Sequence, residues 1–104
     1  MKIYLDDIRN APNEEWITVR TAASLIALLC TQEGHIEVLS LDHDLGEGGK
    51  TGYDVLKWIE AQVFLHGYKP PKKILIHTSN PAGRKNMEAA VRSIYKISSR
   101  DLKS

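Results

Sequence analysis

The sequence predicts a three-layer α/β fold, in which a mostly parallel sheet of four to five strands carries helices on both faces. Three observations point to this fold. Short β-branched and apolar runs occur at residues 2–5, 16–19, 36–41 and 73–76, as expected for strands. Apolar residues at helical spacing follow each of the last three runs. Strands and helices that alternate in this way typically form an open parallel sheet.

Each predicted helix has recognisable signals at its ends. The start signals are Thr21, the capping-box pair Thr51 and Asp54, and the pair Asn80 and Pro81; the stop signals are Gly34 and Gly67. The expected apolar faces consist of Leu25, Leu28 and Leu29, of Val55, Leu56, Ile59, Val63 and Phe64, and of Met87, Ala90, Val91 and Ile94. Residues 95–104 are expected to form a short edge strand, Tyr95 to Ile97, or a loose tail.

Length and composition indicate one ordinary domain over residues 1–104. Of the 104 residues, 42% are hydrophobic and 26% are charged, which is typical of a globular domain. No apolar stretch approaches the roughly 20 residues of a membrane-spanning helix, and no secretory leader is evident. We therefore expect a cytoplasmic protein with no membrane partner. The single cysteine, Cys30, excludes an internal disulfide and is expected to be a small core residue.

Charges are distributed unevenly along the chain. Residues 1–68 carry five basic and eleven acidic side chains, whereas residues 69–104 carry nine basic and two acidic ones. An acidic region attracts metal ions, and a basic region attracts anions such as nucleic acids. Nucleic-acid binding through the basic third is therefore one function that the sequence leaves open, and chance segregation of solvated charges is the simpler alternative.

Polar clusters follow three of the predicted strands: Asp6-Asp7, Asp42-His43-Asp44 and His77-Thr78-Ser79-Asn80. Because the carboxyl ends of parallel strands lie along one edge of a sheet, we expect these clusters to converge. Asp6, Asp7, Asp42 and Asp44 are then candidate ligands for Mg²⁺ or Mn²⁺. His43, His77 and Asp42 are the candidate catalytic residues. The alternative is that these side chains only cap turns and form structural hydrogen bonds.

A candidate phosphate-binding region lies beside these clusters. Asn80 opens a helix whose first N–H groups lack helical partners and suit an anion. Arg84 follows one turn further on and can bind phosphate oxygens. Arg9 and Thr78 complete the candidate phosphate-binding set. Simple N-capping by Asn80 is compatible with this interpretation.

The pair Asp6-Asp7, Asp42, Gly52 and Thr78 together resemble the response-regulator receiver domain, which has a flavodoxin-like fold. In that family the acidic pair binds Mg²⁺, the middle aspartate accepts a phosphoryl group, and the hydroxyl residue contacts that group. The resemblance implies these roles for Asp6 and Asp7, for Asp42 and for Thr78. The lysine–proline pair of the family's fifth strand has no counterpart, so the resemblance implies a receiver-like sheet truncated at its C-terminus.

Four motifs are similar to a divergent branch of that superfamily, the cyclic-phosphate-processing receiver domains. They are Leu5-Asp6-Asp7-Ile8-Arg9, Ser40-Leu41-Asp42-His43-Asp44-Leu45-Gly46, Thr51-Gly52-Tyr53-Asp54 and His77-Thr78-Ser79-Asn80-Pro81-Ala82-Gly83. This resemblance implies a metal-dependent phosphoesterase whose ligand is a cyclic nucleotide or a terminal cyclic phosphate of RNA. The alternative is a module that accepts a phosphoryl group at Asp42 or senses a phosphorylated ligand without turnover.

Overall fold

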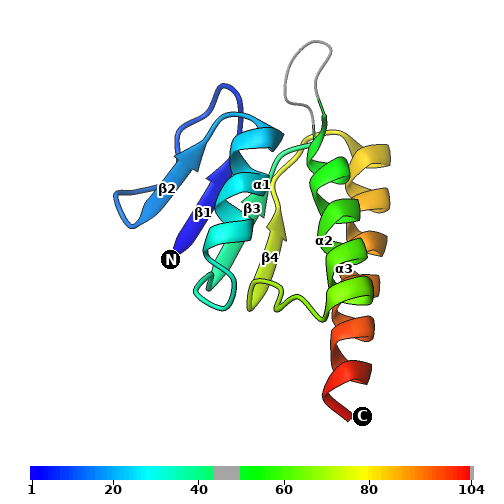
Figure 1. Cartoon of the computed structure of the whole chain (residues 1–104). Helices are drawn as coiled ribbons and strands as arrows, with labels where there is room; N and C mark the ends of the chain where they lie inside the picture. Colours follow the sequence, from blue (N-terminus) through cyan, green and yellow to red (C-terminus); the bar gives the residue numbers. More distant parts are fainter. Residues whose placement is uncertain (44–49, 104) are drawn as a thin grey trace.

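Four parallel strands form the centre of the molecule (Figure 1). The computed structural model describes residues 1–43 and 50–103. Its elements, in chain order, are β1 (Lys2–Leu5), β2 (Trp16–Val19), α1 (Ala22–Thr31), β3 (Val38–Leu41), α2 (Gly52–His66), β4 (Lys73–Ile76) and α3 (Pro81–Lys103). The strand order is β2-β1-β3-β4, and every neighbouring pair is parallel. The predicted parallel α/β class is therefore confirmed, with four strands.

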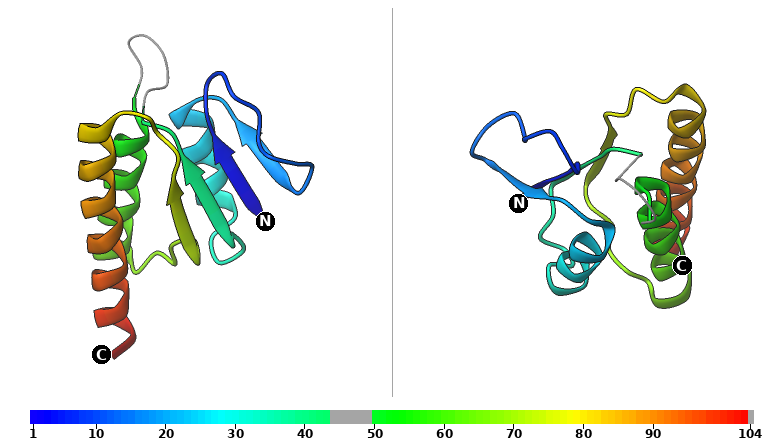
Figure 2. Two further views of the ribbon diagram at one scale, coloured as in Figure 1. Left: turned by 180° about the vertical axis from the view of Figure 1, so that it is seen from behind. Right: turned by 90° about the horizontal axis from the view of Figure 1, so that it is seen from above.

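Helices α1 and α2 lie on the same face of the sheet (Figure 1). Both crossovers, β2–α1–β3 and β3–α2–β4, move along the sheet in the same direction, and right-handed crossovers then place their helices on one face. The connection from β1 to β2 moves the opposite way, and residues 6–15 contain no helix. Seen from behind, no helix passes in front of β1, β3 and β4 (Figure 2). The sequence predicted helices on both faces of the sheet. Among the described residues, helices cover only one face, and the other face is open.

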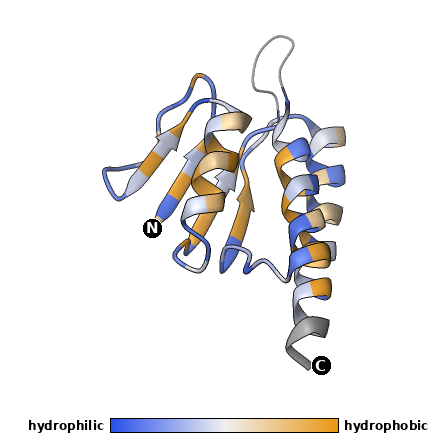
Figure 3. Ribbon diagram, in the orientation of Figure 1, coloured by the Kyte–Doolittle hydropathy of each residue, from blue (hydrophilic) through white to orange (hydrophobic). Residues whose placement is uncertain are grey.

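Burial alternates along β1 and β4, as it does in a sheet with one covered face. Ile3, Leu5 and Leu39 are 0% exposed and belong to the core between the sheet and the helices. Tyr4 lies between two of them and is only half-buried, while Leu75 on β4 is 38% exposed. The strands are largely hydrophobic (Figure 3). We call the side of the sheet that carries Tyr4, Ser40 and Leu75 the open face.

The predicted caps at Thr21, Thr51 and Gly67 are present in the structure, whereas α1 ends at Thr31 with Gln32 as its C-cap, two residues before the expected stop at Gly34. Thr21 accepts a hydrogen bond from the backbone N–H of Ser24. Thr51 and Asp54 form a complete capping box, and Gly67 ends α2 in the left-handed conformation at φ 64°. These local interactions supply partners for the backbone groups that every helix end leaves unpaired.

The predictions for the end of the chain are wrong, because α3 continues to Lys103. Neither an edge strand at 95–97 nor a loose tail follows Ile94. Tyr95 and Ile97 pack against the core, and the Tyr95 hydroxyl donates to the Pro71 carbonyl. These contacts extend the apolar face of the helix and leave β4 as the edge of the sheet.

Two further burial predictions are also wrong. Cys30 is exposed on α1, and Phe64 on α2 is 71% exposed. Each lies one residue beyond a fully buried position, Leu29 or Val63, and one residue rotates a helical side chain by about 100°. The remaining predicted apolar faces are buried or pack against the core. Within the described part of the chain, no helix combines the length and hydrophobicity needed to cross a membrane.

Candidate active site

Three of the predicted site residues occupy equivalent positions at the end of adjacent strands. The register pairs Leu5 with Leu41 and Leu41 with Ile76, so Asp6, Asp42 and His77 are the next residues on β1, β3 and β4. Their backbone N–H groups continue the ladder to Val19, Leu5 and Leu41 at 3.1, 3.0 and 2.9 Å. Because side chains alternate along a strand, all three lie on the side of Tyr4 and Ser40. The candidate site therefore adjoins the open face.

Asp6 is the most buried member of the site, with 1% of its surface exposed. Its Oδ1 accepts the backbone N–H groups of Ile8 and Arg9 at 2.9 and 2.8 Å. Burial alone raises the pKa of this carboxyl, but the Arg9 and Ile8 N–H groups and the His77 ring together hold it below its ordinary value. Asp6 is therefore a buried carboxylate that stays ionised at neutral pH.

The His77 ring is held from three directions. Nε2 lies 3.1 Å from Oδ2 of Asp6, and Nδ1 lies 2.8 Å from Oγ of Ser40. The Tyr4 ring stacks on the imidazole with a centroid separation of 4.2 Å and an interplanar angle of 4°. Since a carboxylate can only accept, Nε2 carries a proton, and in the neutral ring Nδ1 then accepts from the Ser40 hydroxyl.

Asp42 completes a group of possible metal ligands. Its Oδ1 accepts the backbone N–H of His43 at 2.8 Å. One ligand atom from each of Asp6, Asp42 and His77 lies within 4.8 Å of the others. Asp7 is half-buried and does not belong to this group, and Asp44 lies outside the described residues. Because Nε2 of His77 is protonated and Nδ1 is bonded to Ser40, the two carboxylates are the donors that suit a divalent cation such as Mn²⁺ or Mg²⁺.

His43 lies against the start of α3 rather than in the ligand group. A Cβ at Gly83 would come within 2.7 Å of Cδ2 of the His43 ring, so only glycine leaves room for the imidazole there. A Cβ at Gly52 would come within 1.9 Å of the Asp42 carbonyl oxygen, and the Gly52 N–H donates to the His43 carbonyl at 3.0 Å. The two glycines thus hold the segment 42–43 against the starts of α2 and α3.

The candidate phosphate-binding residues have mainly local partners. The Thr78 hydroxyl accepts from the Asn80 N–H at 3.2 Å, and the Asn80 side chain caps α3 by accepting from the Gly83 N–H at 3.0 Å. The Arg84 guanidinium turns back to β4, where Nη2 donates to the Ile76 carbonyl at 2.9 Å. The Arg84 guanidinium therefore lies against the end of β4.

Arg9 influences the site through its charge. Burial raises the pKa of the Tyr4 hydroxyl, the Asp6 carboxylate raises it further, Arg9 lowers it, and Asp42 raises it. The Tyr4 hydroxyl is therefore close enough to both carboxylates and to the Arg9 guanidinium to interact with them electrostatically. Arg9 is exposed, which leaves its guanidinium accessible to an anion at the mouth of the site.

Sequence reasoning did not assign roles to Tyr4 and Ser40, although both contact His77. The alternation of side chains along each strand could have identified them. Tyr4 precedes Asp6 by two residues, and Ser40 precedes Asp42 by two, so each shares a face with the acidic residue. Which side chain on β4 they would meet depends on the pairing of β3 with β4.

The parallel sheet and the acidic ends of β1 and β3 define a receiver-like domain. A family model described as the cyclic-phosphate processing receiver domain matches residues 1–93. The chain therefore belongs to that family, and the resemblance of its motifs is confirmed. No curated protein and no solved structure matches it.

Proposed function

We propose that this protein is a divalent-metal-dependent phosphoesterase that opens a cyclic phosphate, either of a cyclic nucleotide or at the end of an RNA chain. One observation supports it above all: Asp6, Asp42 and His77 bring two carboxylates and an imidazole within 4.8 Å at the carboxyl edge of a parallel sheet. Membership in a family of receiver domains associated with cyclic-phosphate processing agrees with that chemistry. A cytoplasmic setting, where cyclic nucleotides and RNA occur, belongs to the same proposal.

The carboxylates of Asp6 and Asp42 hold the cation in this proposal. Asp6 suits the role because hydrogen bonds keep its buried carboxyl ionised. When bound, Mg²⁺ or Mn²⁺ supplies charge stabilisation to the phosphate oxygens. Asp7 and Asp44 belong to the acidic motifs and are assigned supporting roles, through water or as additional ligands.

His77 is the proton donor of the reaction. Water adds to phosphorus and gives a proton to His43, the bond between phosphorus and one ribose oxygen breaks, and the leaving oxygen takes the Nε2 proton of the His77 imidazolium, which becomes a neutral imidazole. Asp6 and Ser40 fix the ring so that Nε2 carries this proton, and general acid catalysis of this kind contributes about 10²- to 10⁴-fold. We assign the base that activates the water to His43, whose ring lies beside Gly83 at the start of α3.

Arg9, Thr78 and Asn80 surround the phosphate in this arrangement. Thr78 and Asn80 form the turn that leads into α3, and backbone N–H groups at such a helix start favour an anion. Arg9 adds a positive charge next to Asp6 and Tyr4. Together these groups offset the repulsion between the phosphate and the two carboxylates.

The proposal is tested by separating cation binding from turnover. The Asp42→Asn variant should lose Mn²⁺ affinity by about tenfold or more in calorimetry, together with hydrolysis of 2′,3′-cyclic AMP. The His77→Gln variant should keep its Mn²⁺ affinity and lose about 100-fold in kcat. His66→Gln, at the exposed end of α2, is the matched control and should change neither. Absence of Mn²⁺-dependent hydrolysis in the wild type would refute the enzymatic proposal.

A second candidate function is that of a receiver or sensor module. Membership in a receiver family favours it, because Asp42 at the end of β3 matches the phosphoryl-accepting aspartate of receivers. Incubation with acetyl phosphate should then add the mass of one phosphoryl group to Asp42, and hydroxylamine should remove it. If Asp42 stays unmodified, phosphoryl transfer to this residue is excluded, and only the sensing of a phosphorylated ligand remains of this second candidate function.

A further inference from the structure

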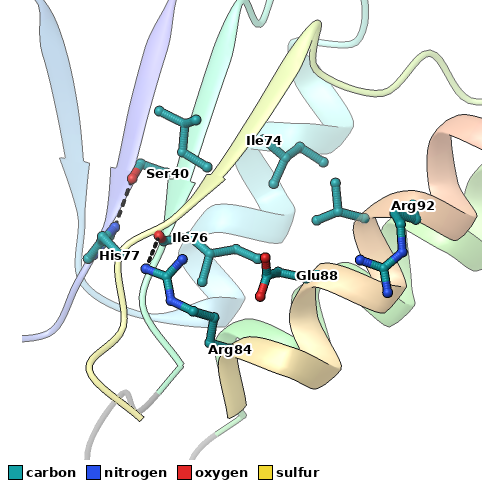
Figure 4. Close-up of a pocket in the computed structure, with 9 residues that line it drawn as sticks. Ser40, Ile74, Ile76, His77, Arg84, Glu88 and Arg92 are labelled. Carbon is teal, nitrogen blue, oxygen red and sulfur yellow. Dashed lines mark hydrogen bonds between the residues drawn. The ribbon is translucent and has the colours of Figure 1, made fainter. Parts of the chain in front are cut away.

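A groove lies between the edge strand β4 and helix α3, and it begins at the candidate active site. Its volume is about 530 Å³. Its residues come from the ends of β3 and β4 and from one side of α3: Ser40, Ile74, Leu75, Ile76, His77, Arg84, Glu88, Val91 and Arg92. Figure 4 shows His77 and Ser40 at one end and Arg92 at the other. A ligand that contacts His77 can therefore continue into this groove.

The α3 wall of the groove alternates in charge. Arg84, Glu88 and Arg92 follow one another at intervals of four residues on the same side of the helix, and all three are exposed. Eight residues of helix span about 12 Å. This wall therefore presents a cation, an acceptor and a second cation over a length greater than that of one phosphate group.

The opposite side of the groove is apolar. Ile74, Leu75 and Ile76 line it from β4, and Val91 adds to it from α3. Leu75 is 38% exposed, so a flat apolar ligand can cover it at a gain of about 25 cal/mol per Å² of apolar surface buried. A nucleobase matches such a surface, while phosphate groups match the two arginines.

The groove does not favour the addition of a fifth strand to β4. A fifth strand would hydrogen-bond to the outward-facing carbonyl of Ile76, but the Arg84 guanidinium already donates to that carbonyl at 2.9 Å. An arginine has five N–H donors, so Arg84 can keep this bond and still bind a phosphate oxygen.

We infer that this groove binds the second nucleotide of an RNA substrate whose terminal cyclic phosphate lies at Asp6, Asp42 and His77. In this arrangement Arg84 and Arg92 bind backbone phosphates, Glu88 accepts from the intervening ribose 2′-hydroxyl, and the base covers the β4 side chains. The 2′-hydroxyl is the donor that distinguishes RNA from DNA. The inference rests on the proposed function and narrows its substrate class to RNA ends of at least two nucleotides.

The test compares two ligands that share the same cyclic phosphate. They are an adenosine RNA dinucleotide that carries a 5′-phosphate and ends in a 2′,3′-cyclic phosphate, and 2′,3′-cyclic AMP. Calorimetry in EDTA measures binding without turnover, and the ratio of the two dissociation constants isolates the second nucleotide. The dinucleotide should bind wild type about tenfold more tightly, a difference of about 1.4 kcal/mol. A ratio near one overturns the inference.

Two variants that each lose one positive charge show whether the tighter binding of the dinucleotide depends on the groove. Arg92→Gln should bring the ratio close to one. Lys96→Gln, on the same helix but outside the groove, should leave the ratio near tenfold. A ratio that survives Arg92→Gln, or that falls equally in both variants, contradicts the inference. A 2′-deoxy group in the second nucleotide should weaken binding to wild type and not to Glu88→Ala, which lacks the acceptor. Equal weakening in both proteins excludes the role of Glu88.

Hydrolysis provides an independent readout. If Mn²⁺ supports no hydrolysis of either ligand while the binding ratio follows the expected pattern, the phosphoesterase proposal fails and the RNA-binding groove stands. If hydrolysis occurs but the dinucleotide binds no more tightly than 2′,3′-cyclic AMP, the inference about the groove is wrong and the enzymatic proposal stands.

Discussion

Nε2 of His77 lies 3.1 Å from Oδ2 of Asp6, although the two residues are 71 positions apart in the chain. The pairing of β1 with β3 and of β3 with β4 brings them together. The same ring is bonded to Ser40 through Nδ1. A carboxylate on one side and a hydroxyl on the other therefore determine which nitrogen of His77 carries the proton.

The Ser40→Ala variant should alter the tautomer of His77. Removal of the hydroxyl that donates to Nδ1 makes the Nδ1–H form more accessible, so its population should rise in ¹⁵N NMR of the imidazole. The loss of a buried hydrogen bond should also cost about 1 kcal/mol in the free energy of unfolding. Ser40→Thr keeps a hydroxyl and should retain the wild-type tautomer. An unchanged tautomer in Ser40→Ala would show that Asp6 alone fixes the ring.

The stability that Asp6 provides should depend on pH. Its pKa is lower in the folded protein than in the unfolded chain, so the ionised carboxylate stabilises the fold above the unfolded value near 4. That contribution is lost as the pH falls through the lower folded-state value. Urea unfolding should therefore show wild type more stable than Asp6→Asn by about 2 kcal/mol at pH 7, with a difference that shrinks below pH 4.

Asp7→Asn is the control for the loss of one negative charge, because Asp7 lies outside the ligand group. Its stability difference from wild type should be smaller at pH 7. A difference between wild type and Asp6→Asn that stays constant from pH 7 to pH 3 would contradict the role of the Asp6 hydrogen bonds.

Gly52→Ala should destabilise the protein strongly. The added Cβ would come within 1.9 Å of the Asp42 carbonyl oxygen, and backbone cannot move aside without displacing the site. We expect a cost of about 3 kcal/mol in urea unfolding. Gly67→Ala is the comparison, because its Cβ would meet nothing within 4 Å and only the φ of +64° is unfavourable; its cost should be about 1 kcal/mol. Equal costs would disprove the steric explanation.

Gly83→Ala should act through His43. The added Cβ would come within 2.7 Å of the His43 ring, which must then rotate away from α3. We expect a cost of about 1 to 2 kcal/mol in stability and a loss of turnover if His43 activates water. In the His43→Ala background the same substitution should cost less than about 0.5 kcal/mol, since the clash is gone. Additive effects in this double-mutant cycle would show that the two residues do not interact.

Much of the fold follows from local patterns in the sequence. The alternation of strands and helices predicted the parallel sheet, and the capping pairs at Thr51 and Asn80 marked where α2 and α3 begin. The position of Asp6, Asp42 and His77 directly after apolar strands predicted a shared edge. These features depend on periodicity and nearest-neighbour hydrogen bonds, which act over a few residues.

The sequence alone determined that acidic and imidazole side chains would meet at the carboxyl edge of a parallel sheet. Only the tertiary structure decided that Asp6 and not Asp7 joins Asp42 and His77, that His43 turns to Gly83, and that α3 continues where an edge strand was expected. Register and helix placement select these partners, because they arise from packing between segments far apart in the chain. A local pattern specifies which way a side chain points along its own strand, but not what the neighbouring strand brings to meet it.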